Sequence, residues 1–172
     1  MAKKITLTSM MIAIALVLNY IEMLIPINFG IPGIKIGLAN IVSLTTLFIL
    51  GPIPAISVQI GRILLGGLMF GNGISILYSL SGGLLSIFVM IVIYKIDKPK
   101  LSIIGISAIG AVFFNIGQLA IAAFMIQSLN IVYYLPMLII FGALMGIFVG
   151  MISKYLVKAL DKWKLINNNS EP

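Results

Sequence analysis

Residues 32–42 read Pro-Gly-Ile-Lys-Ile-Gly-Leu-Ala-Asn-Ile-Val. The stretch opens with turn residues and continues as an apolar run, yet it holds a lysine, two glycines and an asparagine among aliphatic neighbours. Further along the chain comes Arg62, again with apolar residues on both sides. A cation inside hydrocarbon is costly, and a protein keeps one there only where it faces a partner or a water-filled cavity. We therefore expect residues 32–42 and the helix of Arg62 to form one wall of a binding site inside a membrane bundle.

The composition is that of an integral membrane protein. Of the 172 residues, 61% are hydrophobic and 9% are charged, whereas a soluble domain carries about 25% charged residues. A soluble fold of this size could not bury so much apolar surface. The chain shows neither a separate soluble domain nor an internal repeat, so we expect a single membrane domain over residues 1–172.

Few side chains of this protein can perform chemistry. The chain has no cysteine and no histidine, and its acids are Glu22, Asp97, Asp161 and Glu171. This composition excludes histidine-based catalysis, metal sites built from thiolates or imidazoles, and a two-metal carboxylate cluster. We therefore expect that the chain is not an enzyme and that it holds no metal and no cofactor.

Apolar runs suited to membrane helices, which need about 20 residues, recur along the chain. They predict an all-α bundle of six transmembrane helices at residues 5–25, 36–50, 55–70, 74–96, 101–127 and 131–160. The second is short and is stopped by Gly51-Pro52-Ile53-Pro54. Short or Pro/Gly-interrupted helices are common around the binding sites of transporters.

The distribution of charge predicts the side of the membrane on which the termini lie. If the N-terminus is cytoplasmic, Lys35 falls in an outer loop, Arg62 falls within a span, and the other basic residues fall in cytoplasmic segments. Those residues are Lys3, Lys4, Lys95, Lys98, Lys100, Lys154, Lys158, Lys162 and Lys164. Cytoplasmic segments carry such an excess of lysine and arginine. The pattern favours cytoplasmic termini, and it explains the net charge of +7 without nucleic acid as a partner.

In this topology the polar residues can converge on one extracellular-facing cavity. Asn115 and Gln118 are three residues apart and share a helix face, as do Gln59 and Arg62. The cavity would bind a small anionic or amphipathic molecule. The expected ligand-binding residues are Glu22, Lys35, Asn40, Gln59, Arg62, Asn115 and Gln118.

Each of these assignments has a structural alternative. The guanidinium of Arg62 presents five donors and suits a carboxylate or phosphate, but it could instead pair with Glu22 or with backbone carbonyls. Glu22 is open to three roles: counter-ion of Arg62, proton carrier or interfacial carboxylate. Lys35 could extend to the aqueous interface, and Asn115 and Gln118 could join helices by hydrogen bonds.

Small residues mark surfaces for close helix packing. Gly66-Gly67 and Gly82-Gly83 fit close packing better than phosphate binding, because the chain shows no strand and no Walker-type spacing. Ser9 and Ala13 are four apart on the first helix, and such a pair lets another helix approach closely.

The assembled motifs resemble a known family. Residues 32–42, followed by Leu50-Gly51-Pro52 and by Arg-Ile-Leu-Leu-Gly-Gly-Leu-Met-Phe-Gly at residues 62–71, are similar to the Gx transporter family, also labelled heptaprenyl diphosphate synthase component I. The likeness spans roughly residues 5–160. It implies a six-helix fold similar to the substrate-binding (S) components of energy-coupling factor transporters, which capture a vitamin or other micronutrient from outside the cell.

The resemblance also implies partners and a location. S components work with a transmembrane coupling protein and a pair of cytoplasmic ATPases, and the small-residue face around Ser9 and Ala13 lies where such proteins contact the coupling protein. The chain itself contains no ATPase motif. The expected location is a bacterial plasma membrane, which the chain would cross several times.

The same resemblance leaves a role outside transport open. Some family members resemble membrane components of flavin-based extracellular electron transfer systems. The prenyl synthase label would require an aspartate-rich site for Mg²⁺ and diphosphate, whereas the chain offers only the isolated Asp97 and Asp161. The chain would at most assist a prenyl synthase in isoprenoid or quinone synthesis.

Overall fold

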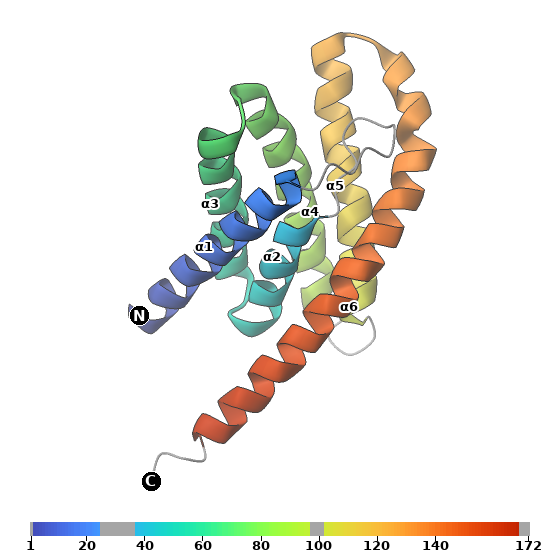
Figure 1. Ribbon diagram of the computed structural model, residues 1–172. Helices are drawn as coiled ribbons and strands as arrows, with labels where there is room; N and C mark the ends of the chain where they lie inside the picture. The colour runs from blue at the N-terminus through green and yellow to red at the C-terminus, as the bar shows by residue number, and fades with distance from the viewer. Residues whose placement is uncertain (1, 25–36, 97–101, 169–172) are drawn as a thin grey trace.

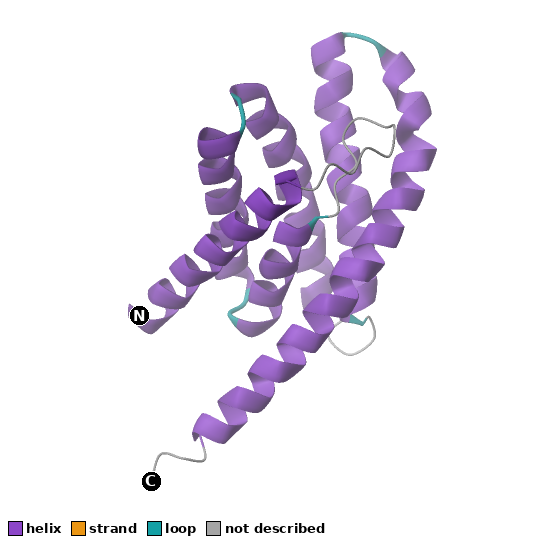
Figure 2. Cartoon of the chain, in the orientation of Figure 1, coloured by secondary structure: helices purple, strands orange, loops and turns teal. Residues whose placement is uncertain are grey.

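The protein is a bundle of α-helices. The computed structural model describes residues 2–24, 37–96 and 102–168, and within these ranges it contains no strand. The helices are drawn in Figure 1, and Figure 2 shows that short loops join several of them. They are α1 (Ala2–Leu24), α2 (Leu38–Ile49), α3 (Pro52–Phe70), α4 (Gly73–Ile96), α5 (Ile103–Ile126), the 3₁₀ helix η1 (Leu129–Tyr134) and α6 (Leu135–Asn168). The all-α prediction is confirmed.

The helices have the length and the surface of a membrane protein. In the described part of the chain, five helices are long and apolar enough to cross a membrane. Large apolar side chains point outward, and Ile53, Leu68 and Phe124 are 76–80% exposed. A soluble protein rarely exposes apolar surface on this scale. The bundle is therefore an integral membrane protein.

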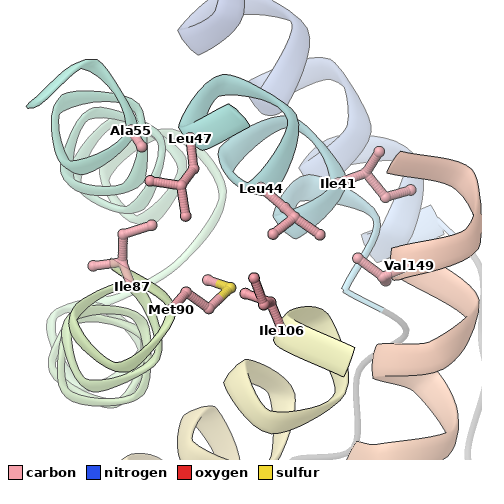
Figure 3. Packing of buried hydrophobic residues seen from close by; sticks show 8 residues of the cluster. All are labelled: Ile41, Leu44, Leu47, Ala55, Ile87, Met90, Ile106 and Val149. Atoms are coloured by element: carbon pink, nitrogen blue, oxygen red, sulfur yellow. The ribbon is translucent and has the colours of Figure 1, made fainter. Parts of the chain in front are cut away.

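The short helix α2 lies at the centre of the bundle. Its 12 residues extend about 18 Å, less than the roughly 30 Å of a hydrocarbon core, so the six-span count remains a prediction. The residues from Ile41 to Leu47 are all buried. Figure 3 shows Ile41, Leu44 and Leu47 facing side chains from the other helices. Those partners are Ala55 on α3, Ile87 and Met90 on α4, Ile106 on α5 and Val149 on α6.

Glycines bring α5 close to its two neighbours. A Cβ added at Gly117 would lie 2.8 Å from the carbonyl oxygen of Ser81 on α4, and one at Gly146 would lie 2.7 Å from Cα of Ala108 on α5. The Ser81 hydroxyl donates to the Gly117 carbonyl at 2.6 Å. Small residues allow this backbone approach, which is a common basis of helix association in membranes. The backbones thus leave no room for a side chain at these crossings.

Two helix boundaries differ from the prediction. The third helix begins at Pro52 and not near Ala55, because proline is tolerated in the first turn, where its missing N–H has no intrahelical partner anyway. The last helix is preceded by the 3₁₀ helix η1 and begins at Leu135, and not at Ile131.

The start of α1 and the end of α6 lie at the same end of the bundle (Figure 1). Helix α6 has 34 residues and projects beyond its neighbours at that end (Figure 1). The α3–α4 turn and the α5–η1 turn lie at the opposite end, which is called the mouth end below.

Candidate functional site

Arg62 lies inside the bundle, in the middle of α3. Its side chain is 7% exposed. Its Nε donates to Oε1 of Gln59 at 3.2 Å, and its Nη2 donates to Oδ1 of Asn40 on α2. A guanidinium has five N–H groups, so among the described residues three of them have no protein acceptor. Arg62 therefore neither reaches the aqueous interface nor faces lipid.

Glu22 holds the beginning of α2. Its carboxylate accepts hydrogen bonds from the backbone N–H groups of Gly37 at 2.6 Å and Leu38 at 3.1 Å. The first N–H groups of a helix lack intrahelical partners, and the helix dipole favours an anion there. Gly37 has φ 82°, a conformation that suits glycine. Glu22 therefore caps α2, a role that was not predicted from the sequence, and the three roles expected for it stay predictions.

Glu22→Gln is expected to loosen the start of α2. The amide keeps one acceptor oxygen but loses the charge and the second acceptor, which should cost about 1 kcal/mol. Hydrogen–deuterium exchange should show faster exchange at the Gly37 and Leu38 amides. Thr8→Ala is the control, because the Thr8 hydroxyl donates only to the exposed Lys4 carbonyl of the same helix. Unchanged exchange in Glu22→Gln would rule out the cap.

Arg62 and Glu22 open on one cavity of about 140 Å³ between the helices. Although both groups line it, no carboxylate among the described side chains forms an ion pair with Arg62. All six α-helices contribute to the wall. Its polar members are Asn19, Glu22, Asn40, Arg62, Ser75, Ser79, Ser86, Ser107 and Asn115, and its large apolar members are Met23, Leu44, Ile63, Phe70, Met90, Phe114, Phe141, Met145 and Val149.

The other predicted polar residues divide between the cavity and the helix interfaces. Asn115 lines the cavity, and its Nδ2 also donates to the Leu138 carbonyl of α6 at 2.7 Å. Gln118 does not line the cavity. Its side chain lies against Gly82 of α4, because the Cβ of an alanine at position 82 would lie 2.8 Å from Cγ of Gln118. The structure therefore does not bring Gln118 into the site, although it shares a helix with Asn115. Gln59 is 1% exposed and lies behind Arg62 as its acceptor.

Two further predictions concern residues away from the cavity. Ser9 and Ala13 are exposed on α1, while Ala15 of the same helix is buried. The pair is thus available at the surface, and its contact with a partner remains a prediction. Lys35 lies outside the described residues.

Five polar residues of the cavity were not predicted from the sequence. Asn19 is three residues before Glu22 and shares its helix face, and Ser75, Ser79 and Ser86 recur at helical spacing on α4. Ser107 lies near the start of α5. These spacings were a usable signal, but serine is so common in packed membrane helices that it did not distinguish a cavity wall from a helix contact.

The arrangement is suited to binding an anion. Desolvated surroundings strengthen electrostatic attraction, and Arg62 is held in place by Gln59 and Asn40. No group of three or more metal-ligating side chains occurs within the described ranges. The site can therefore position a small negatively charged molecule against apolar walls.

Comparison with known proteins identifies the family. The model of the family described as heptaprenyl diphosphate synthase component I matches residues 11–156, which confirms the resemblance expected from residues 32–42 and 62–71. Neither the curated proteins nor the solved structures include a match to the chain. Because the matched region covers most of its length, the chain belongs to the heptaprenyl diphosphate synthase component I family.

Proposed function

We propose that this protein is the membrane-embedded substrate-binding subunit of an energy-coupling factor-type transporter. It would capture a small anionic or amphipathic micronutrient or precursor from outside the cell. The observation that carries the proposal is Arg62, a cation buried in the bundle that opens on a cavity and has no carboxylate paired with it among the described side chains. Intramembrane cations in such positions mark substrate pathways.

The charges support an outward-facing cavity. Exposed lysines occur at the start of α1, the end of α4 and the end of α6, and those helix ends lie opposite the mouth end (Figure 1). They are Lys3, Lys4, Lys95, Lys154, Lys158 and Lys162. Since lysine-rich segments stay in the cytoplasm, the mouth end would face outward in a bacterial plasma membrane. Glu22, Asn19 and Ser75 would then be the part of the cavity nearest the outside.

Transport in this proposal requires partners, because the chain contains no ATPase motif that could supply the energy. A coupling protein would contact the small-residue face of Ser9 and Ala13 on α1, where the surface is exposed. Two cytoplasmic ATPases would supply the energy. Nucleic acid is not among the proposed partners.

The proposal predicts which proteins co-purify with the chain. Affinity purification from its own host in mild detergent should recover a membrane coupling protein and two ATPases in fixed ratio. Ala13→Leu should reduce this recovery at least tenfold, because the larger side chain blocks close helix approach. Val17→Leu is the control, since Val17 is already large and 58% exposed on the same helix.

A second candidate function follows from the family description. It names a component of heptaprenyl diphosphate synthase, and this supports an accessory role in isoprenoid or quinone synthesis, or in flavin-based extracellular electron transfer. Recovery of a prenyl synthase or a flavoprotein without any ATPase, in the same purification, would favour this role and contradict the transporter proposal.

A further inference from the structure

The cavity holds two opposite charges that do not form an ion pair with each other. Arg62 and Glu22 both line it, and the other lining side chains among the described residues are amides, hydroxyls or apolar groups. Within the described ranges, Arg62 donates only to the side-chain oxygens of Gln59 and Asn40. Glu22 accepts only from backbone N–H groups there. The described charges of the wall therefore sum to zero, and neither has a charged partner among the described side chains.

Both charges keep hydrogen-bonding capacity for a ligand. A guanidinium has five N–H groups, and Arg62 uses two of them within the described part of the chain. A carboxylate has about four acceptor positions, and each oxygen of Glu22 accepts one hydrogen bond, from Gly37 and Leu38 respectively. Arg62 can therefore still bind an anion, and Glu22 can still bind a cation.

The two charges approach the start of α2 from different helices. Glu22, on α1, accepts from the N–H groups of Gly37 and Leu38. Arg62, on α3, donates to the side chain of Asn40. The backbone N–H of Asn40 donates to the Gly37 carbonyl at 2.9 Å, and a Cβ added at Gly37 would lie 3.0 Å from Nδ2 of Asn40. Because one turn at the start of α2 provides both anchor points, separate uncharged partners hold the two charges close together.

The cavity limits the size of a molecule that could contact both charges. Its volume is about 140 Å³, close to that of a cavity of ~150 Å³ that accepts a benzene molecule. A ligand enclosed there has about six non-hydrogen atoms in all, and this number includes its charged ends. Compact zwitterions such as alanine and β-alanine have this size.

We propose that the ligand is a compact zwitterion, whose carboxylate binds Arg62 and whose ammonium group binds Glu22. A plain carboxylate of the same size would be attracted by Arg62 but repelled by the nearby Glu22, and a plain amine would be repelled by Arg62. A zwitterion compensates both charges, as buried charges require. The inference rests on the proposed substrate-binding function and narrows its anionic ligand to one that also carries a cationic group.

Two pairs of probes with matched shapes test the inference. Alanine is compared with isobutyrate, and β-alanine with butyrate, because a methyl group then replaces the ammonium group of the zwitterion. Titration calorimetry at neutral pH uses the purified full chain in lipid nanodiscs, with empty nanodiscs subtracted. The zwitterion of at least one pair should bind about tenfold more tightly than its partner, or better, as a hydrogen bond between charged groups provides.

Glu22→Gln separates contact with the ligand from the cap of α2. Without the carboxylate, alanine and β-alanine should lose most of their advantage. Isobutyrate and butyrate should bind at least as tightly as to the wild type, because a repulsive charge is gone, whereas a variant that only loosened α2 would weaken all four probes. Asp161→Asn is the matched control, since it makes the same chemical change at an exposed position of α6, and it should keep the full preference.

Opposite effects of Glu22→Gln on the two classes of probe would support the inference. Equal binding within both pairs, a preference that survives in Glu22→Gln, equal weakening of all probes in that variant, or no binding of any probe would overturn it. The transporter proposal would stand in each of these cases, because it depends on the co-purified ATPases and on the need for Arg62.

Discussion

Arg62→Met is expected to abolish anion binding while leaving the bundle folded. Methionine fills much of the same space but offers no donor, so affinity for benzoate and hexyl phosphate should fall by about two orders of magnitude, as when one partner of a buried charge pair is removed. Methionine also leaves the side-chain oxygens of Gln59 and Asn40 without the donor that Arg62 provides, so the temperature of unfolding should fall modestly. Loss of anion binding in a bundle that remains folded is the result that a ligand-binding Arg62 predicts.

Titration in nanodiscs and thermal unfolding of the same samples measure the two effects. Lys158→Met is the control, because Lys158 is exposed on α6 and should change neither quantity. Arg62→Lys should bind with intermediate affinity, since lysine keeps the charge but not the planar arrangement of donors. If Arg62→Met destabilised the bundle strongly and still bound the anions as well as the wild type, Arg62 would be a structural residue.

Gly146→Val is expected to destabilise the protein by about 3 kcal/mol, at the upper end of overpacking effects. A Cβ at this position would lie 2.7 Å from Cα of Ala108 and 2.9 Å from the carbonyl oxygen of Ser107. Both are backbone atoms, so α5 and α6 would have to separate. A lower temperature of unfolding and less monodisperse protein after size-exclusion chromatography should report this change.

Gly73→Val is the matched control for this substitution. Gly73 is exposed at the start of α4, and a Cβ added there has no atom within 4 Å. The variant should unfold within a few degrees of the wild type. Equal stability of the two variants would show that α5 and α6 do not depend on close backbone contact at Gly146.

The helices themselves were predictable from apolar runs, because hydrophobic length directly reflects the thickness of the membrane. The start of α3 could not be predicted in the same way. Pro52 and Pro54 indicate the end of a helix, although proline is also tolerated in the first turn of a helix. The central position of α2 could not be predicted from the sequence either. Its sequence is apolar, but nothing in it distinguishes a short helix surrounded by others from one that faces lipid.

The site was predictable only in part. Arg62 and Asn40 stand out, because polar groups among apolar neighbours require a reason, and the structure joins them by a hydrogen bond. The role of Glu22 depends on where α2 begins relative to α1. The relative position of two helices belongs to the tertiary structure and cannot be derived from the spacing of residues in the sequence. Gln118 shares a helix with Asn115, yet Gln118 lies against Gly82 of α4, whereas Asn115 bonds to α6 and reaches the cavity, and the spacing of the two residues does not reveal this difference.

The length of α6 connects the cavity to the aqueous phase. Residues 135–153 carry no charge and extend about 28 Å, which is close to the thickness of the hydrocarbon. The remaining residues to Asn168 continue the same helix for about another 22 Å. Because Phe141, Met145 and Val149 line the cavity, a tilt of α6 by about 5° at Val149 displaces its far end by about 2.5 Å. In the proposed topology, a straight helix of this length would convert a small change around a bound molecule into a larger movement in the water outside the membrane.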